Sequence, residues 1–299
     1  MKPLISIIIP TYNRAHLIGE TLDSILTQTY THWECIAIDD GSTDTTENAL
    51  KEYVVKDPRF QYYKRPKNRP KSANTCRNYG LELAKGNYII FFDSDDLMTP
   101  KHIEIKLEAI QKNNYDYAIA QTRFFNYDAG NALLEKQYHY QTKDITVHNY
   151  ICHKISWLTY DTLIQSDLAK SISFNETLKA GQEYNYFCKL ILKSTNALLI
   201  EDIVTLRRYH DASIRGRLRK NKIQQYQSYF NTYWQTYLDI QRVASDDSKR
   251  FLMYRCYRMF LKMPKKERPN TNDLKNALLK EFGLKAVYYI LHLYFKNVI

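Results

Sequence analysis

A strand-like segment that runs straight into three acids is the first feature of the sequence that suggests chemistry. Residues 91–96 read FFDSDD and place Asp93, Asp95 and Asp96 within four positions. Carboxylates this close raise one another's pKa unless a cation neutralises them, and a hard divalent ion with oxygen ligands does so directly. The DxD pattern therefore indicates a Mn²⁺ or Mg²⁺ site with open positions for substrate phosphates. Taken alone, the same residues are as typical of a solvated turn or a helix N-cap.

The segments around these acids alternate between strand and helix patterns. Residues 4–9, LISIII, form a continuous β-branched run, which predicts a buried strand of a mostly parallel sheet. Further strands are expected at 33–40, 60–65 and 87–92, and helices at 15–28, 47–56 and 73–84. This alternation predicts a Rossmann-like, doubly wound α/β sheet, in which ligands bind at the carboxyl ends of the strands.

The second half of the chain is less regular and becomes helical. The patterns predict helices at 101–111, 184–193, 224–238 and 250–262, and strands at 115–125 and 197–204. The polar, tyrosine-rich stretch at 126–146 receives no assignment. The last segment, 285–299, mixes aliphatic and aromatic residues with lysine and histidine. It is either a helix packed into the core or one that lies in a membrane interface with Lys285 and Lys296 at the headgroups.

The positive charge is concentrated in the last third of the chain. The net charge is +11, and residues 207–299 hold 20 Lys and Arg against 7 Asp and Glu, which leaves 23 against 25 in residues 1–206. A basic region of this kind suits anionic lipid headgroups or nucleic acid. A solvated basic surface that keeps the protein soluble explains the charge equally well.

Cysteine usage and hydropathy indicate a cytoplasmic setting. The five cysteines are scattered and form no CxxC pair, so neither a disulfide framework nor a thiolate zinc site is indicated. The apolar run near the amino terminus is too short for a signal-peptide core, and no stretch reaches the roughly 18 apolar residues of a membrane span. We expect a cytoplasmic protein that is either free or docked on the cytoplasmic face of a membrane.

Four motifs in a fixed order resemble the nucleotide-binding half of family 2 glycosyltransferases of the bacterial surface-polysaccharide type, which have the GT-A fold. They are PTYN at 10–13, DDGS at 39–42, RNYG at 77–80 and DSDD at 93–96. The resemblance is clear over residues 4–112 and looser to about residue 215. It implies a GT-A domain at 1–215, with a nucleotide-binding half at 1–112 and an acceptor half at 113–215, followed by a helical, basic region at 216–299.

The resemblance implies a nucleotide site at the ends of the first two strands. The nucleotide would lie against Pro10, Thr11, Tyr12 and Asn13, and Asp40 would accept a hydrogen bond from the base. An aromatic ring supplies stacking area, and a carboxylate can read a uracil N–H. For Tyr12, the structural alternative is an aromatic loop residue that fills the edge of the core.

The resemblance also assigns the acids and one arginine. Arg77 would face the nucleotide or its phosphates, although an arginine on a helix is by default solvated. Asp93 would approach the ribose or the metal, and Asp95 would be the principal metal ligand. Asp96 is either a supporting acid or an N-cap.

Inverting transfer needs a base, because the acceptor hydroxyl loses its proton as it attacks the anomeric carbon. The family usually supplies the base from a Glu-Asp pair that opens a helix. The segment FNETLKAGQEYNYF at 174–187 has Gln182 and Glu183 at that place, which makes Glu183 the candidate base. Gln182 is neutral where the family usually has an acid, and the alternative role for Glu183 is that of an acid favoured by the helix dipole.

The segment RRYHDASIRGR at 207–217 corresponds to a loop that closes over the diphosphate in the family. Its candidates for the diphosphate are Arg208, His210 and Arg215, and His210 is also a candidate metal ligand or a purely structural histidine. Trp157 and Tyr160 either stack on the acceptor sugar or pack in the core.

Together these features predict a metal-dependent, inverting glycosyltransferase. It would move a sugar from a nucleotide-diphosphate donor, a UDP-sugar, to a hydroxyl of a glycan or lipid-linked oligosaccharide. One alternative is a catalytically silent module that binds a sugar nucleotide or a glycan. Another is a metal-dependent nucleotidyltransferase, which the absence of a GxxxxGK loop disfavours. A nucleic-acid binder would leave the acidic motifs without a role.

Overall fold

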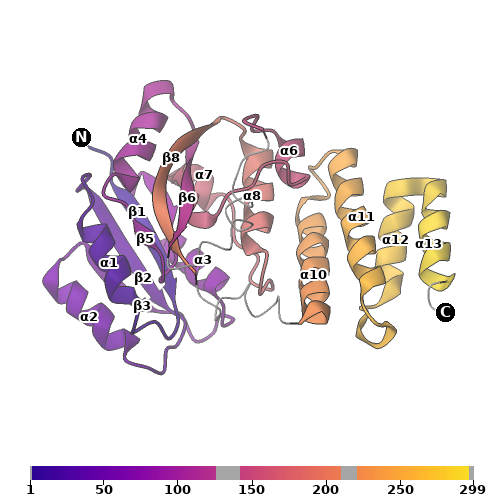
Figure 1. Ribbon diagram of the computed structural model, residues 1–299, viewed down its shortest axis with the longest axis horizontal. Coiled ribbons are helices and arrows are strands. Elements are labelled where there is room, and N and C mark those ends of the chain that lie inside the picture. The colour runs from indigo at the N-terminus through magenta and orange to yellow at the C-terminus, as the bar shows by residue number, and fades with distance from the viewer. Residues whose placement is uncertain (1, 126–141, 210–220, 296–299) are drawn as a thin grey trace. The chain divides into compact units, whose positions relative to one another are not determined.

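The computed structural model describes residues 2–125, 142–209 and 221–295 (Figure 1). The chain forms two compact units, each assembled from separate segments. The first contains Met1–Ile145, Ile155–Glu176 and Lys193–His210, and the second contains Thr146–Lys154, Thr177–Leu192 and Asp211–Ile299. The boundaries at residues 112 and 215 stay predictions.

The first unit is built on one sheet with the strand order β3-β2-β1-β4-β7-β6-β8-β5 among the described residues. Strands β1 to β4 run parallel to their neighbours in that group, β6 and β8 are parallel, and β7 and β5 run antiparallel to theirs. The predicted α/β fold with a mostly parallel sheet is confirmed. The strands are β1 (Ile5–Thr11), β2 (Trp33–Asp39), β3 (Phe60–Lys64), β4 (Tyr88–Phe91), β5 (Leu97–Met98), β6 (Tyr117–Phe125), β7 (Thr162–Gln165) and β8 (Ala197–Arg208).

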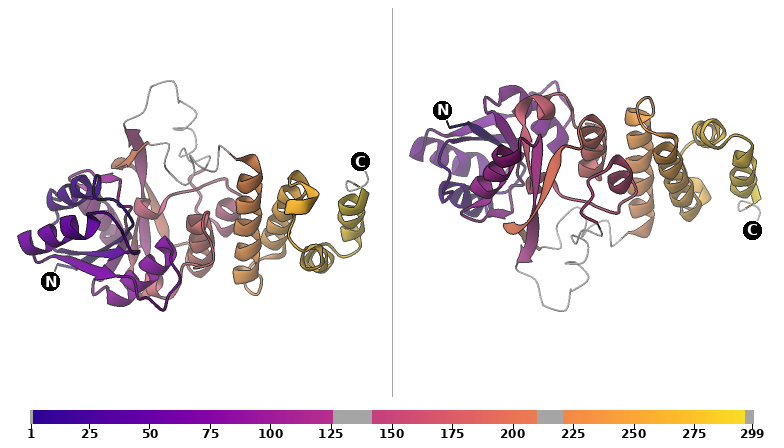
Figure 2. Two further views of the ribbon diagram at one scale, coloured as in Figure 1. Left: turned by 90° about the horizontal axis from the view of Figure 1, so that it is seen from below. Right: turned by 90° about the horizontal axis from the view of Figure 1, so that it is seen from above.

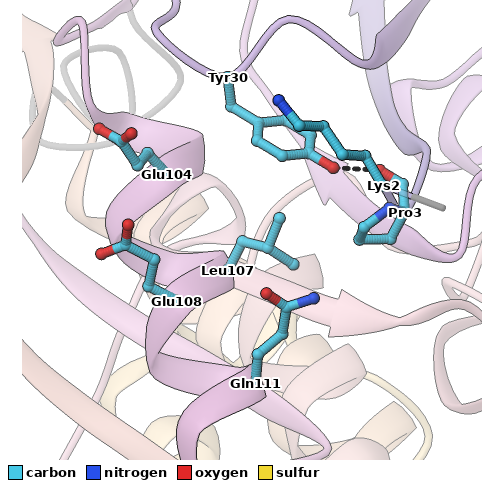
Figure 3. A pocket seen from close by; sticks show the side chains of 7 residues that line it. All are labelled: Lys2, Pro3, Tyr30, Glu104, Leu107, Glu108 and Gln111. Atoms are coloured by element: carbon cyan, nitrogen blue, oxygen red, sulfur yellow. Dashed lines mark hydrogen bonds between the residues drawn. The ribbon is translucent and has the colours of Figure 1, made fainter.

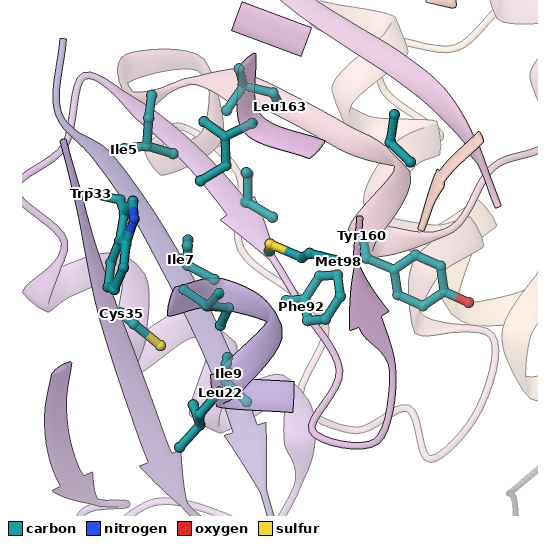
Figure 4. Close-up of a cluster of buried hydrophobic side chains, with 14 of the residues drawn as sticks. Ile5, Ile7, Ile9, Leu22, Trp33, Cys35, Phe92, Met98, Tyr160 and Leu163 are labelled. Carbon is teal, nitrogen blue, oxygen red and sulfur yellow. The ribbon is translucent and has the colours of Figure 1, made fainter. Parts of the chain in front are cut away.

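Helices cover both faces of this sheet (Figure 1). They are α1 (Ile18–Leu26), α2 (Thr46–Lys56), α3 (Ala73–Leu83), α4 (His102–Asn113) and the short α7 (Ser166–Lys170), with a 3₁₀ turn, η3 (Thr159–Asp161). Every side chain of β1 is buried. Ile5, Ile7 and Ile9 pack in one cluster with side chains of α1, α2 and α4 (Figure 4). The run of isoleucines is explained by burial on both faces.

Helix α3 lies against the opposite face of β1. A Cβ atom on Gly80 would come within 2.3 Å of Cγ2 of Ile8, so only glycine lets the helix approach the strand this closely. Ile8 points to this face because side chains alternate along a strand. Arg77 lies one turn earlier on the same helix, so this contact also sets the distance between Arg77 and the sheet.

A buried lysine ties α4 to η3, and a neighbouring buried histidine ties α4 to β8. Lys106 Nζ donates to the Tyr160 carbonyl at 2.7 Å and lies 3.0 Å from Nε2 of His102. The His102 ring contacts the Val204 carbonyl through Nδ1 at 3.0 Å. Burial lowers the pKa of Lys106 to about 7, although the negative charge of Asp161 opposes this change. Burial also lowers the pKa of His102 well below its usual value.

The second unit is helical. Its helices are α6 (Val147–Ile151), α8 (Gln182–Lys193), α10 (Lys222–Ile240), α11 (Asp246–Lys262), α12 (Thr271–Phe282) and α13 (Ala286–Phe295), with 3₁₀ turns η4 (Lys265–Glu267) and η5 (Gly283–Lys285). From α10 to α13, each helix packs on the next in chain order, as the colours from orange to yellow in Figure 2 show. Side-chain caps from Asn221, Ser245 and Asn270 start three of them. No helix among the described residues is both long and apolar enough to cross a bilayer.

Several elements differ from the sequence patterns. Strand β8 continues to Arg208, four residues beyond the predicted end, because its second half pairs with β5 and β6. Strands β5 and β7 are too short to give a periodic signal. Trp157 and Tyr160 are buried, which supports core packing rather than sugar stacking. Of the unassigned stretch, residues 126–141 lie outside the described part of the chain.

Helix α13 packs through only one of its faces. Ala286 and Leu293 are buried, and the Tyr289 ring contacts the rings of Tyr257 and Phe282. An exposed apolar stripe, defined by Leu284, Val287, Tyr288 and Leu291, runs along the other face with the helical spacing i, i+3, i+4, i+7. The prediction that residues 285–299 pack into the core therefore describes only one face of α13.

The low pKa of Lys106 should make stability depend on pH. Between about pH 7 and the usual lysine value near 10.4, the unfolded chain binds more protons than the folded chain, so this group favours folding more as pH rises. Relative to Lys106→Met, we expect the wild type to gain up to about 1.4 kcal/mol of unfolding free energy per pH unit in that range. Urea unfolding at several pH values measures the difference.

The control for this measurement is Lys112→Met, an exposed position on the same helix, which should show no such trend. If the difference in unfolding free energy between the wild type and Lys106→Met stays constant with pH, the low pKa of Lys106 is refuted.

Candidate functional site

The carboxyl ends of β1, β2 and β4 lie side by side. Thr11 is in register with Asp39, and Ile8 of β1 is in register with Phe91, two residues before Asp93. The chain therefore brings three of the four predicted motifs to one edge of the sheet. Pro10 and Thr11 are the last residues of β1, and both are buried.

The loop after β1 is locked to the loop after β2. Asn13 has a left-handed backbone with φ of 51°, a conformation that asparagine tolerates better than most residues. Its N–H donates to Ser42 Oγ at 2.9 Å, and its Oδ1 accepts from the Thr43 N–H at 2.8 Å. The Arg14 N–H donates to Thr46 Oγ1 at 2.8 Å. Asn13 thus fixes the loop from which Tyr12 and Arg14 project.

The two acids after β2 have different roles. Asp39 Oδ1 accepts from the N–H of Ser42 at 2.9 Å and from its hydroxyl at 2.6 Å, which closes the turn. Asp40 Oδ1 accepts from Nε of Arg65 at 2.5 Å. Burial raises the pKa of Asp40, and Arg65 and then Lys71 oppose this rise. Asp40, the predicted base-reading acid, is therefore held by a partner that the motif does not contain.

Tyr12 projects from the edge rather than into the core. The residue is 40% exposed, and Lys71 Nζ lies 3.7 Å from the ring centroid. The alternative of an aromatic residue that fills the core edge does not describe this geometry. An exposed ring beside a cation suits a ligand that combines a flat base with phosphates.

Arg77 is buried, so the default expectation of a solvated helical arginine is wrong. Only 3% of the residue is exposed, and Nη2 donates to Asp93 Oδ1 at 2.7 Å. Its guanidinium also lies over the ring of Phe174. Within the described residues, Nε and Nη1 of Arg77 are buried and have no hydrogen-bond partner.

Asp95 and Asp96 are both tied to the end of β8. Arg14 Nη2 lies 3.2 Å from Asp95 Oδ2. The Asp95 carbonyl accepts from Arg208 Nε at 3.1 Å, and Asp96 Oδ1 accepts from the Arg208 N–H at 2.8 Å. Burial raises the pKa of Asp96 well above its usual value, and the charges of Asp95 and Asp93 add to this rise. Asp96 is thus a supporting acid that holds β8, and it caps no helix.

Of the three cationic residues predicted to bind the diphosphate, only Arg208 lies in the described part of the chain. Arg208 Nη2 pairs with Glu20 of α1 at 2.8 Å, so its guanidinium bridges α1 and the acidic loop. His210 and Arg215 lie outside the described residues.

Buried polar atoms without partners gather at this edge. Within the described part of the chain they include Thr11 Oγ1, Arg14 Nε, and Nε and Nη1 of Arg77. Buried polar atoms normally find partners, so a group of unsatisfied ones is typical of a surface that receives a polar ligand.

The carboxylates fit a metal that is shared with a substrate. The described residues contain no cluster of three or more His, Cys, Asp or Glu side chains placed to hold an ion. Asp93 and Asp95 keep 27% and 17% of their side chains exposed. Two hard oxygen donors suit Mn²⁺ or Mg²⁺ when phosphate oxygens and water complete the coordination, as is common for such ions.

Glu183 lies on the second unit. It is the second residue of α8, is partly exposed, and is the acid of the first helical turn. The helix is anchored within its unit by the fully buried Asn185, whose Nδ2 donates to Asp239 at 2.8 Å. The role of Glu183 as a base stays a prediction.

A pocket of about 530 Å³ lies elsewhere in the first unit (Figure 3). It sits at the residues that precede β1, whereas the acids follow the carboxyl ends of the strands, so we assign it no part in the chemistry. Its lining is Lys2, Pro3, Tyr30, Glu104, Leu107, Glu108 and Gln111, with the Tyr30 hydroxyl donating to the Pro3 carbonyl.

Sequence reasoning missed the partners of the acids. Arg65 and Lys71 come from the segment between β3 and α3, and Arg14 directly follows the PTYN motif. Arg14 could have been suspected because it adjoins the motif, but no spacing rule links Arg65 to Asp40.

Solved structures share this fold. The structure superposes on the S. aureus TarS 1–349 complex with UDP-GlcNAc with a TM-score of 0.69 and 20% identity, over 93% of this chain and 80% of that one. It also superposes on the mannosyltransferase PcManGT of Pyrobaculum calidifontis, in complex with GDP-Man and Mn²⁺, with a TM-score of 0.63 and 17% identity, over 100% and 81% of the two chains. The expected GT-A fold is confirmed.

Relatives and a family model agree with the fold. An uncharacterized glycosyltransferase of Methanocaldococcus jannaschii is 27% identical over 239 residues, which cover 78% of this chain and 80% of the relative. TuaG of Bacillus subtilis, described as a candidate glycosyltransferase of teichuronic acid biosynthesis, is 39% identical over 113 residues, or 38% of this chain and 44% of TuaG. Several other relatives are matched over less than half of their length. The family model "Glycosyl transferase family 2" matches residues 6–175, more than half of the 299 residues, and the chain therefore belongs to glycosyltransferase family 2.

Proposed function

We propose that this glycosyltransferase is metal-dependent and inverting, and that it moves a sugar from a UDP-sugar to a hydroxyl of a glycan or lipid-linked oligosaccharide in surface polysaccharide synthesis. One observation carries the proposal. The ion pairs Asp40–Arg65, Asp93–Arg77 and Asp95–Arg14 lie at the carboxyl edge of a parallel sheet, with buried donors that lack partners in the described structure. This edge offers a base-reading acid, phosphate-binding cations and two metal-binding carboxylates.

The base would bind between Tyr12 and Asp40. The exposed Tyr12 ring supplies a stacking surface, and the Asp40 carboxylate accepts an N–H from the base. Uracil and guanine both present such an N–H. We favour uracil, in line with the UDP-GlcNAc complex of the similar TarS structure, and treat guanine as the competing outcome.

The diphosphate would bind near Arg77, with Arg208, His210 and Arg215 as further candidate cations. Asp95 and Asp93 would hold Mn²⁺ or Mg²⁺. When bound, such an ion supplies electrostatic stabilisation of the charge that develops on the departing diphosphate. The buried guanidinium of Arg77 supplies a fixed positive charge at the same edge, which costs no reorganisation during the reaction.

Glu183 would act as the general base. The acceptor oxygen forms a bond to the anomeric carbon, the bond from that carbon to the diphosphate breaks, and the hydroxyl proton passes to the Glu183 carboxylate. The support comes from the sequence resemblance and from the partly exposed position of Glu183 in the first turn of α8. Gln182 is neutral where the family usually has an acid. That departure is the one observation that favours the second candidate, a silent module that binds its donor without turnover.

We further propose that the second unit docks on an anionic membrane surface. The exposed stripe on η5 and α13 is apolar, and Leu284 is 93% exposed. From Leu284 to Ile299 the sequence contains Lys285 and Lys296 but no Asp or Glu. An apolar stripe flanked by lysines and free of acids suits the boundary between acyl chains and anionic headgroups. Lipid-linked acceptors would be presented at such a surface.

Donor binding should require the metal and Asp95. By calorimetry with Mn²⁺, we expect UDP to bind at least about tenfold more tightly than CDP, GDP or dTDP. Asp95→Ala or removal of Mn²⁺ should weaken UDP binding by a similar factor, because a metal ion held by Asp95 would supply positive charge for the phosphates. Asp57→Ala is the control, since Asp57 is equally exposed and also paired with an arginine. If only GDP binds, the donor is a GDP-sugar rather than a UDP-sugar. If no nucleotide binds, the acidic motif is only a turn at the end of a strand.

Loss of the base should separate binding from turnover. Glu183→Gln should bind UDP like the wild type but transfer sugar about 10² to 10⁴ times more slowly, because it cannot accept the proton. Release of UDP from a panel of UDP-sugars, with glycan acceptors, measures turnover. The exposed Glu201→Gln should leave the rate unchanged. A wild type that binds UDP-sugar without any turnover would support the silent module instead.

Vesicle binding should depend on charge and on the stripe. We expect stronger co-sedimentation with vesicles that contain phosphatidylglycerol than with pure phosphatidylcholine. Replacing both Leu284 and Leu291 by Gln should weaken this binding roughly tenfold through lost apolar burial. Val55→Gln, a similarly exposed position on α2, is the control. Equal binding of the wild type and the double variant would argue against docking through α13.

A further inference from the structure

The ion pair between Arg14 and Asp95 occupies the carboxylate that is proposed to bind the metal. Arg14 Nη2 lies 3.2 Å from Asp95 Oδ2, and the two side chains are 30% and 17% exposed. A guanidinium and a divalent cation cannot both sit against one carboxylate oxygen without strong mutual repulsion. The contact therefore bears directly on how an ion enters this site.

The main chain of Arg14 is held independently of its side chain. Its N–H donates to Thr46 Oγ1, and its carbonyl accepts from the N–H groups of Leu17 and Ile18 at 2.9 Å each. The Arg14 Nε is buried without a hydrogen-bond partner in the described part of the chain. The guanidinium can consequently leave Asp95 without unfolding the loop.

Asp95 is also held through its main chain. Arg208 Nε donates to the Asp95 carbonyl, and the Arg208 N–H donates to the neighbouring Asp96. The first contact uses the main-chain carbonyl of Asp95 and the second uses the carboxylate of Asp96, so neither involves the Asp95 carboxylate that meets Arg14. The position of Asp95 is therefore set by β8 and does not require the ion pair.

Of the three acid–arginine pairs at this edge, the two that involve the proposed metal ligands differ in burial. Arg77, paired with Asp93, has only 4% of its side chain exposed, against 30% for Arg14. A partly exposed ion pair contributes little to stability, whereas breaking a buried pair is strongly destabilising. Arg14 is thus the arginine that a competing cation would displace more easily, and Arg77 is the one that would stay.

We propose that Arg14 acts as a counter-cation of Asp95, that it competes with the divalent ion for this carboxylate, and that the displaced guanidinium then contacts the donor diphosphate. This rests on the proposed donor and metal site. It makes Arg14 a residue that couples metal binding to nucleotide binding. The ion alone has to displace Arg14, whereas the ion together with a diphosphate offers Arg14 a new partner, so each ligand should tighten the binding of the other.

Substitution of Arg14 should have opposite effects on the affinities for Mn²⁺ and for UDP, and this would identify its role. Arg14→Gln removes the competing charge, so the nucleotide-free protein should bind Mn²⁺ about three- to tenfold more tightly than the wild type. With saturating Mn²⁺, the same variant should bind UDP about tenfold more weakly, because the phosphate contact is lost. Electron paramagnetic resonance of free Mn²⁺ measures the first quantity, and calorimetry measures the second.

Matched variants separate this role from a structural one. Arg59→Gln removes an arginine of similar exposure, 33%, from its pair with Asp57 and should change neither affinity. Arg14→Lys keeps the charge and should bind Mn²⁺ like the wild type. Thermal unfolding provides a further readout, since added Mn²⁺ should stabilise Arg14→Gln more than it stabilises the wild type.

Three results would overturn the proposal. They are weaker or unchanged Mn²⁺ binding by Arg14→Gln, unchanged UDP binding by that variant, and absence of Mn²⁺ binding to both proteins. The last result is distinct from failure of the proposed function. A wild type that still binds UDP and transfers sugar without metal would keep the glycosyl transfer, but it would refute both its metal dependence and the exchange. A protein that binds no nucleotide would lose the transfer as well.

Discussion

Negative charge collected at the end of buried strands has to be neutralised, and the layout of the first unit follows from how this is done. Asp40, Asp93 and Asp95 each meet an arginine, and Asp96 accepts a main-chain N–H from β8. The arginines come from three different segments, so neutralising the acids also ties those segments together. Residues 1–206 are nearly balanced in charge, which is consistent with acids that are matched internally.

The rigidity of the edge comes from packing beneath it. Isoleucines on both faces of β1 are covered by helices, so the strand cannot shift without exposing one layer. Above the strand ends, Asn13 and Ser42 join the first two loops, and Lys106 joins α4 to the chain near β7. The acids therefore stand on a scaffold held by packing and internal hydrogen bonds, which is a requirement for electrostatic preorganisation.

The fold and the edge could be predicted from the sequence because their signals are local. The isoleucine run in β1, the helical spacing in α1 and the DSDD motif are local signals. Each of them is formed by residues that lie close to one another in the sequence. The arginine partners could not be predicted, because Arg65 lies 25 residues from Asp40, and Arg14 meets Asp95 only after the sheet has formed. Burial of Arg77 was missed for the same reason. The role of Glu183 depends on a different unit, which no local pattern describes.

The close contact between Gly80 and Ile8 has a consequence for the interpretation of natural variants. Gly80 and Arg77 are three residues apart on α3 and therefore share a side of the helix. A methyl group at position 80 has no space above the strand, so the helix would have to rise and carry Arg77 away from Asp93. A glycine-to-alanine change, usually regarded as benign in a helix, would then break the contact between Arg77 and Asp93 from a position outside the candidate site. Inherited loss of activity at such a position would be misread if only ligand-contacting residues were inspected.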